Sequence, residues 1–355
     1  MPLHALSHYS YDFRDINATV NFTINLDAKS NKLPFNIFDQ EWKEVPVAQK
    51  SNRAFGQVYT DVYVDYEGLK IGVFGEKIAE VEINDGFIDL WYSAQKDFLQ
   101  LLVSKDIYKT IEPNSIKGEA NYCNPYGLYL QKVFALNSSN FLSVKLKLNY
   151  ADEMQYIKVN GYTNSEKFSG SLDYVYAQEN YISNTNNKRQ GPMAIGYGVD
   201  IEYIYNRDKL YVYLGAYNLA SSMYWSNVTH MHYDFDSEVI YKGDDGYNHY
   251  KPFGVGNYKY NQSFRQKLPV YYKASLNYEF YDSFALGNNF KLYNQMYSNE
   301  PHVNFKIYNG RYKLGYQIED NIFLFGTYFR NVNFEVANKF GLEDNVLQAN
   351  IKLSF

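Results

Sequence analysis

Several features that define common protein classes are scarce or missing in this sequence of 355 residues. It contains one cysteine, Cys123, so no intramolecular disulfide can stabilise the fold. No segment approaches the roughly 18 apolar residues of a membrane-spanning helix, which excludes a helical membrane protein. Excess positive charge is also missing, because the net charge is −5 and no basic cluster occurs. We therefore expect no nucleic acid partner.

Common catalytic signatures are missing as well. The chain has no G-x-S-x-G elbow, no HExxH motif, no phosphate-binding loop and no dinucleotide fingerprint. Six histidines are scattered along it, and spacing alone pairs none of them with a serine. We expect no cofactor, and enzymatic activity stays open as the less favoured interpretation.

Aromatic residues, by contrast, are abundant. They make up 19% of the chain, and 39 of them are tyrosine. Tyrosine suits positions where a ring has one apolar side and one wet end. Such positions occur at the interface between a membrane and water.

The main structural signal is alternation of apolar and polar residues, the period of a β-strand. It recurs along the chain in segments without an interleaved helical period, among them 16–27, 57–66, 69–76, 141–150, 198–205 and 271–280. This pattern predicts an antiparallel all-β fold of about 14–16 strands. We expect residues 1–355 to form one barrel domain, with 28–54 and/or 84–124 as loops or folded into the interior. Residues 237–267 are also expected to be a loop.

Alternation alone fits either a soluble sandwich or a transmembrane barrel with its apolar face toward lipid. Two features favour the barrel. Many strands run about 10 residues, the length of a tilted membrane-crossing strand. Tyrosines also flank predicted turns, as in an aromatic girdle: Tyr150 and Tyr156, Tyr205 and Tyr211, Tyr308 and Tyr312.

The C-terminal segment NVLQANIKLSF, residues 345–355, carries the most specific pattern. Its apolar residues fall at every second position and end on Phe355. This resembles the insertion signal of Gram-negative outer-membrane β-barrel proteins of the porin-like type. The resemblance implies a transmembrane barrel closed by pairing of the last strand with the first. It also implies a bacterial outer-membrane location, insertion by the barrel-assembly machinery, contact with membrane lipid and possible homo-oligomers.

If lipid meets the apolar face, the polar face lines the lumen. We predict these lumen-lining residues: Lys145, Lys147, Asp200, Glu202, Lys273, Glu279, Lys306, Lys313 and Lys352. Both signs of charge occur, so the set predicts neither anion nor cation preference. The alternative is a salt-bridged filling without selectivity.

The segment THMHYDFD, residues 229–236, is the sharpest local motif. On a strand, His230, His232, Asp234 and Asp236 share one face. We consider His230 and His232 as metal ligands, for example of Zn²⁺. An Asp–His pair could instead activate water, as in outer-membrane proteases. The simpler interpretation is a polar inner face beside a loop.

Three functions follow from these observations. The favoured one is a porin-like outer-membrane channel for passive passage of small polar solutes. The alternatives are a hydrolytic enzyme embedded in the barrel, and an adhesin or anchor subunit of an envelope assembly.

Overall fold

The computed structural model of the protein describes residues 19–31, 52–87, 114–163, 168–178, 193–236, 240–244, 246–250, 254–293, 295–308, 310–318, 322–329, 332–338 and 346–354. This part of the chain is almost entirely β-strand, with one helical turn at 85–87. None of its helices is both long and apolar enough to span a bilayer. Phe355, and parts of the single domain expected for 1–355, lie outside the described residues.

Nineteen strands form one antiparallel sheet, and two short strands form a separate hairpin. The strands of the large sheet are β1 (Thr19–Asn31), β2 (Asn52–Tyr66), β3 (Leu69–Ile83), β4 (Asn114–Cys123), β5 (Tyr126–Ala135), β6 (Asn140–Ala151), β7 (Met154–Thr163), β8 (Phe168–Ala177), β9 (Ala194–Arg207), β10 (Leu210–Tyr217), β11 (Ser222–Asp236), β14 (Gly254–Gln266), β15 (Tyr271–Tyr281), β16 (Phe284–Tyr293), β17 (Met296–Ile307), β18 (Gly310–Gln317), β19 (Ile322–Phe329), β20 (Val332–Asn338) and β21 (Val346–Ser354). The hairpin consists of β12 (Ile240–Lys242) and β13 (Asn248–Tyr250).

The large sheet closes on itself. Strand β1 pairs with β2 on one side and with the C-terminal β21 on the other, so Ile24 lies opposite both Thr60 and Ile351. The predicted pairing of the last strand with the first is therefore confirmed. Closure leaves no sheet edge around this ring, which removes a row of unpaired backbone groups.

Five pairs of consecutive strands lie end to end and act as single long staves. Strands β4 and β5 both pair with β3, at Ile78 with Cys123 and at Gly75 with Tyr126, without a shift of register. The other end-to-end pairs are β6 with β7, β8 with β9, β10 with β11, and β14 with β15. The nineteen strands therefore make a barrel of fourteen staves, within the predicted range.

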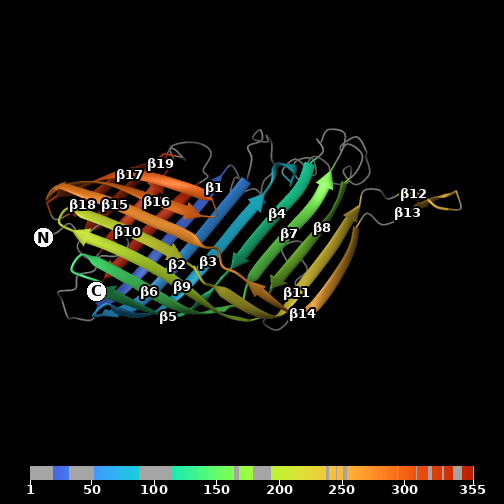
Figure 1. The fold of residues 1–355 in the computed structure, drawn as a ribbon, viewed down its shortest axis with the longest axis horizontal. Helices are drawn as coiled ribbons and strands as arrows, with labels where there is room; N and C mark the ends of the chain where they lie inside the picture. Colours follow the sequence, from blue (N-terminus) through green and yellow to red (C-terminus); the bar gives the residue numbers. More distant parts are fainter. Residues whose placement is uncertain are drawn as a thin grey trace.

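The barrel wall is tall on one side and low on the other (Figure 1). Strands β18 to β21 have only seven to nine residues each. The long staves continue past them as a curved sheet of β4, β7, β8, β11 and β14, which we name the extension. The connections that the structure describes at the opposite end are short, from two to four residues at 67–68, 136–139, 208–209 and 282–283. Thr19 and Ser354 lie at this short-turn end.

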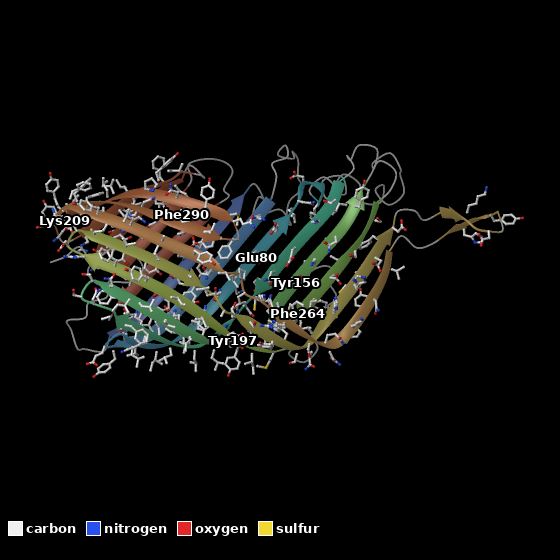
Figure 2. The ribbon with its side chains drawn as sticks, viewed as in Figure 1. Glu80, Tyr156, Tyr197, Lys209, Phe264 and Phe290 are labelled. Atoms are coloured by element: carbon white, nitrogen blue, oxygen red, sulfur yellow. The ribbon has the colours of Figure 1, made fainter. Side chains whose placement is uncertain are left out.

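The two faces of the barrel differ in chemistry, as the alternation predicts. On β6, the inward side chains of Lys145 and Lys147 are buried, whereas Leu146 between them is 53% exposed on the outside. Figure 2 shows Tyr197 and Phe290 on the outside as well, and both are about two-fifths exposed. A barrel with an apolar exterior and a polar interior results.

Three sequence expectations need correction. Residues 254–266 are strand β14 rather than loop. Most of this strand is exposed, so it lacks an alternating apolar signal. Strand β4 covers part of the expected loop 84–124, and 28–31 and 52–54 belong to β1 and β2. The remainder of those two segments, 32–51 and 88–113, lies outside the described residues.

The third correction concerns Asp152, which marks a kink within a long stave rather than a turn. The side chain of Asn124 donates a hydrogen bond to Asp152 Oδ1 at 2.8 Å and accepts one from the backbone N–H of Glu153 at 3.0 Å. The polar groups at the breaks of two neighbouring staves, at 124–125 and 152–153, thus form hydrogen bonds with each other. Turn-forming residues serve here to bend the sheet.

Candidate functional site: the inner face of the barrel

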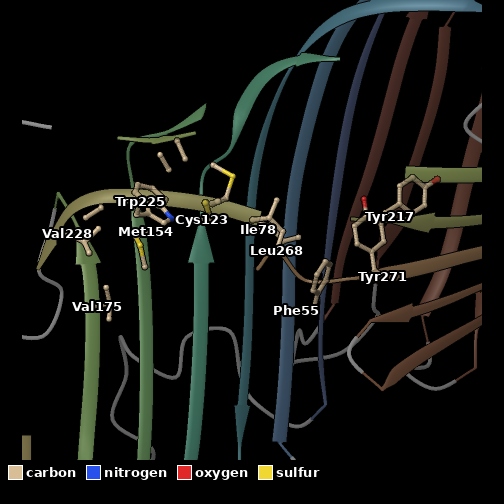
Figure 3. Packing of buried hydrophobic residues seen from close by; sticks show 14 of the residues in the cluster. Phe55, Ile78, Cys123, Met154, Val175, Tyr217, Trp225, Val228, Leu268 and Tyr271 are labelled. Carbon is tan, nitrogen blue, oxygen red and sulfur yellow. The ribbon is translucent and has the colours of Figure 1, made fainter. Parts of the chain in front are cut away.

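An apolar layer of buried side chains lies on the inside of the barrel where the long staves pass into the extension (Figure 3). We name this layer the collar. Its main side chains are Phe55, Ile78, Cys123, Met154, Trp225, Leu268, Tyr271, Tyr293 and Met296, and none is more than 6% exposed. They come from strands far apart in the sequence and meet because their staves reach the same level.

Aromatic rings form one side of the collar. The rings of Tyr217 and Tyr271 are stacked with centroids 4.7 Å apart, and those of Phe55 and Tyr293 are stacked at 4.4 Å. Tyr271 and Tyr293 join the two pairs at 5.7 Å. Such contacts add to the stability gained from burial alone.

The tyrosine hydroxyls connect the collar to a charged layer deeper in the barrel. Tyr293 Oη donates a hydrogen bond to Asp27 Oδ2 at 2.6 Å, and Tyr217 Oη donates to Glu202 Oε1 at 3.2 Å. Tyr271 Oη accepts one from Gln57 Nε2 at 2.9 Å. The rings therefore belong to the apolar layer and their hydroxyls to the polar one.

Asp27 is the centre of one charged cluster. Lys291 Nζ lies 2.9 Å from Asp27 Oδ1, and Lys273 Nζ lies 3.2 Å from Asp27 Oδ2. With Tyr293, this carboxylate accepts hydrogen bonds from three side chains on two other strands. A buried carboxylate is stable when its lone pairs are satisfied in this way.

A second pair of lysines lies on β6. Lys147 Nζ lies 3.0 Å from Asp200 Oδ1 and donates to Asn218 Oδ1 at 2.6 Å. Lys145 Nζ lies 4.0 Å from the centroid of the Tyr129 ring and 3.9 Å from Asp61 Oδ2. Both ammonium groups are thus buried among carboxylates and aromatic rings.

The third cluster lies on β17 and β18. Lys313 Nζ and Glu300 Oε1 are 2.5 Å apart, and both side chains are buried. His302 Nε2–H donates a hydrogen bond to Asn277 Oδ1 at 2.8 Å. This part of the inner face is polar and closely packed.

Six of the nine residues predicted to line the lumen have buried or mostly buried side chains: Lys145, Lys147, Asp200, Glu202, Lys273 and Lys313. Glu279 is partly exposed and Lys306 exposed, near the short-turn ends of their strands. Lys352 lies on β21 opposite Thr23 and Asn333. The prediction missed three residues at inward-facing polar positions of their strands: Asp27 on β1, Lys291 on β16 and Glu300 on β17.

The histidines of the sequence motif lie on the inner face of the extension, beyond the collar. Asp173 Oδ1 is 3.2 Å from His230 Nε2 and 2.8 Å from His232 Nδ1, and Asp234 Oδ1 is 3.3 Å from His232 Nε2. The hydrogen bond that His232 donates to Asp173 raises the pKa of His232 above its usual value. Burial opposes ionisation of Asp173, but the hydrogen bonds from His232 and His230 outweigh it and lower the pKa of Asp173. Within the described ranges, no group of three or more His, Cys, Asp or Glu side chains has an arrangement that could hold a metal ion.

Comparison with known proteins finds likenesses among solved structures only, since no protein-family model and no curated protein matches the chain. A mutant of the TodX monoaromatic hydrocarbon channel is 10% identical, with 96% of this chain and 89% of that one covered and a TM-score of 0.45. A FadL homologue from Pseudomonas aeruginosa is 10% identical (95% and 87% covered, TM-score 0.37). The outer-membrane protease OmpT from Escherichia coli is 11% identical (97% and 100% covered, TM-score 0.29). At these values the likenesses give no information about what the chain transports or acts on.

Proposed function

We propose that this chain is a bacterial outer-membrane β-barrel channel for small polar solutes, closed in the conformation described above. The observation that carries the proposal is a closed barrel with an exposed apolar exterior and a polar interior. Around the barrel, outward side chains such as Ile71, Leu128, Leu146, Leu276 and Phe323 are about half exposed. An apolar surface of this extent marks a membrane contact.

The distribution of turns supports an orientation. In outer-membrane barrels, short turns face the periplasm and longer connections face the exterior. The short-turn end, with Thr19 and Ser354, would then be periplasmic, and the extension would project from the cell. The barrel-assembly machinery and membrane lipid are the partners this placement requires, and a homo-oligomer is compatible with it.

The buried inner face supports a channel that has to open. A barrel of about 8 strands is filled by side chains, whereas one of about 16 can hold an aqueous channel. Fourteen staves lie between these limits. We infer that the collar and the ion pairs beneath it block the interior, so that a solute passes only when the collar moves.

A test compares the native barrel with a collar variant in planar bilayers. Trp225→Ala removes a buried ring of the collar, and Tyr197→Ala removes an exposed ring from the outside as the matched control. We expect stable ion currents from Trp225→Ala and rare or small ones from the native protein and Tyr197→Ala. The thiol of Cys123, buried in the collar, should react with a maleimide several-fold faster in Trp225→Ala.

The outcome that contradicts the channel is a correctly folded, heat-modifiable barrel that gives no current in any of the three proteins. A second candidate would then gain weight. The contacts of Asp173 with His230 and His232, on a partly exposed face, favour a hydrolytic enzyme. Loss of peptide or ester hydrolysis in His232→Ala, with folding retained, would support it.

A further inference from the structure

The buried charges of the inner face are divided between two halves of the barrel. One half, on β2, β3, β6 and β9, holds the carboxylates Asp61, Glu76, Asp200 and Glu202 with the ammonium groups of Lys145 and Lys147. We name it the acidic half. Lys70 is also buried there. Its Nζ lies 3.9 Å from Asp65 Oδ2, and the two charges of this pair cancel.

The opposite half has the reverse balance. On β1 and β15 to β18, the carboxylates of Asp27 and Glu300 are outnumbered by Lys273, Lys291 and Lys313. Four carboxylates with two ammonium groups leave the acidic half two negative charges in excess. Two carboxylates with three ammonium groups leave the other half one positive charge in excess. The interior is thus polarised across its width.

Two carboxylates of the acidic half, Glu76 and Glu202, form no ion pair with the side chains that the structure describes. Glu76 accepts a hydrogen bond from Gln57 at 2.6 Å, and Glu202 accepts hydrogen bonds from Gln131, Tyr213 and Tyr217. Among the described side chains, no lysine, arginine or histidine nitrogen forms an ion pair with either. The hydrogen-bond partners of both carboxylates are thus neutral, and Lys147 and Lys145 act on Glu76 only from beyond ion-pair distance.

Two further groups on this half are buried without hydrogen-bond partners in the part of the chain that the structure describes. One is Asp61 Oδ1, whose companion oxygen accepts from Tyr59 at 3.1 Å and Tyr129 at 2.9 Å. The other is the side-chain amide of Asn149, which is 0% exposed and lacks a partner for both Oδ1 and Nδ2. Buried polar groups of this kind are usually paired, with water or an ion where protein offers nothing.

We propose that the acidic half gives the channel a preference for small cations, and that Asp61 and Asn149 coordinate a passing cation or the water it carries. The inference rests on the proposed channel function. Carboxylate, hydroxyl and amide oxygens are the ligands that hard cations prefer. In the described region no group of three or more His, Cys, Asp or Glu side chains is arranged to hold a metal ion, which fits transient coordination rather than a tight metal site. Rings of one charge set selectivity in open pores by the same physics.

The direct test measures reversal potentials in a potassium chloride gradient, in the conducting Trp225→Ala background. We expect potassium to permeate better than chloride. Asp61→Asn should lower the potassium-to-chloride permeability ratio roughly five- to tenfold, the effect of one unit charge acting over about 10 Å on both ions at an effective dielectric constant of about 50 to 70, as in a wet pore. Glu202→Gln should act in the same direction, and Lys145→Met in the opposite one.

Asp208→Asn is the matched control, because it removes one carboxylate from an exposed turn. Asp208 has a positive φ of 52°, which asparagine also tolerates, and its charge is screened by solvent. The ratio should therefore stay unchanged. A parent channel that prefers chloride, or a ratio that Asp61→Asn and Glu202→Gln leave unchanged, would overturn the inference while the channel stands.

A second readout does not depend on conduction. A ligand that binds only the folded state raises its melting midpoint. The heat-modifiable transition should occur at higher temperature in potassium chloride than in choline chloride of equal concentration, and Asp61→Asn should remove the difference. Equal midpoints in the parent would contradict cation coordination. If no variant conducts, the channel proposal fails, and a potassium-dependent midpoint would still support the cation site.

Discussion

Lys291 Nζ lies 2.9 Å from Asp27 Oδ1, although 264 positions separate the two residues in the chain. The contact crosses the inside of the barrel from β1 to β16. Together with Lys273, it joins the N-terminal stave to two staves that are not its neighbours in the sheet. Backbone pairing forms the wall, and side chains such as these fix its interior.

The Asp27 cluster predicts a large loss of stability on truncation. Asp27→Ala leaves the ammonium groups of Lys273 and Lys291 buried without their carboxylate, which costs about 3–5 kcal/mol. Urea unfolding of the refolded barrel should show this loss, and Asp208→Asn should differ from the native protein by less than about 0.5 kcal/mol. Similar midpoints for Asp27→Ala and the native protein would mean that solvent reaches the cluster.

Two glycines on neighbouring strands should respond differently to alanine. A Cβ at Gly72 would lie 2.7 Å from both Val62 O and Tyr63 Cβ, whereas one at Gly56 meets no atom within 4 Å. Gly72→Ala should therefore destabilise the barrel by about 1–3 kcal/mol through overpacking. Gly56→Ala should leave stability unchanged or raise it slightly. Equal unfolding midpoints for the two variants would show that the sheet relaxes freely around Gly72.

Leu146 tests whether the exterior faces lipid. Leu146→Arg should cost about 2–4 kcal/mol in a bilayer if this position is near its midplane. The variant should also insert poorly into vesicles, as followed by heat-modifiable migration. Leu146→Ala should insert normally. If the exterior instead met water, arginine at this half-exposed position would be close to neutral, and both variants would fold alike.

The pair of His232 and Asp173 predicts a local pH dependence. The folded pKa of His232 is raised, so its contribution is present below the unfolded value of about 6.5 and is lost as the pH rises through the folded pKa. The pKa of Asp173 is lowered, so its contribution is present above about 3.9 and is lost as the pH falls through the folded pKa. The contact is therefore strongest between about pH 4 and 6.5.

The size of this effect is below about 1 kcal/mol, because both side chains are partly exposed and solvent screens them. Its measurement is an NMR titration of the imidazole carbons. Asp173→Asn should shift the His232 midpoint downward toward about 6.5, and His230→Gln identifies the signal of the neighbouring His230. A titration of His232 that Asp173→Asn does not move would remove Asp173 as the cause.

The sequence could predict the features that depend on alternation alone. Lys145 and Lys147 flank Leu146 on β6, so their burial and its exposure follow from the period of a strand. The same reasoning predicts the closing strand β21. Alternation also places Asp27 on the polar face of β1 and Lys291 on the polar face of β16. Extending the pattern to the ends of these strands would therefore have predicted both residues on the inner face.

The collar could not be predicted, because it depends on register between strands. Phe55, Cys123 and Trp225 come from separate segments, and no spacing within one segment shows that their staves meet at one level. Strand β14 was not predicted from the sequence for another reason. It lies beyond the barrel with most of its side chains exposed, so burial imposes no alternation on them.

The unequal height of the wall has a consequence for how molecules reach the mouth. Among the described strands, β4, β7, β8, β11 and β14 rise above the mouth on one side, whereas β18 to β21 end below that level. In the proposed orientation, a molecule diffusing parallel to the cell surface meets the tall strands as a barrier on one side and only the shorter described strands on the other. For the proposed channel, the capture rate would then depend on the rotation of the barrel about its own axis, and crowding by neighbours would slow entry most when they occupy the low side.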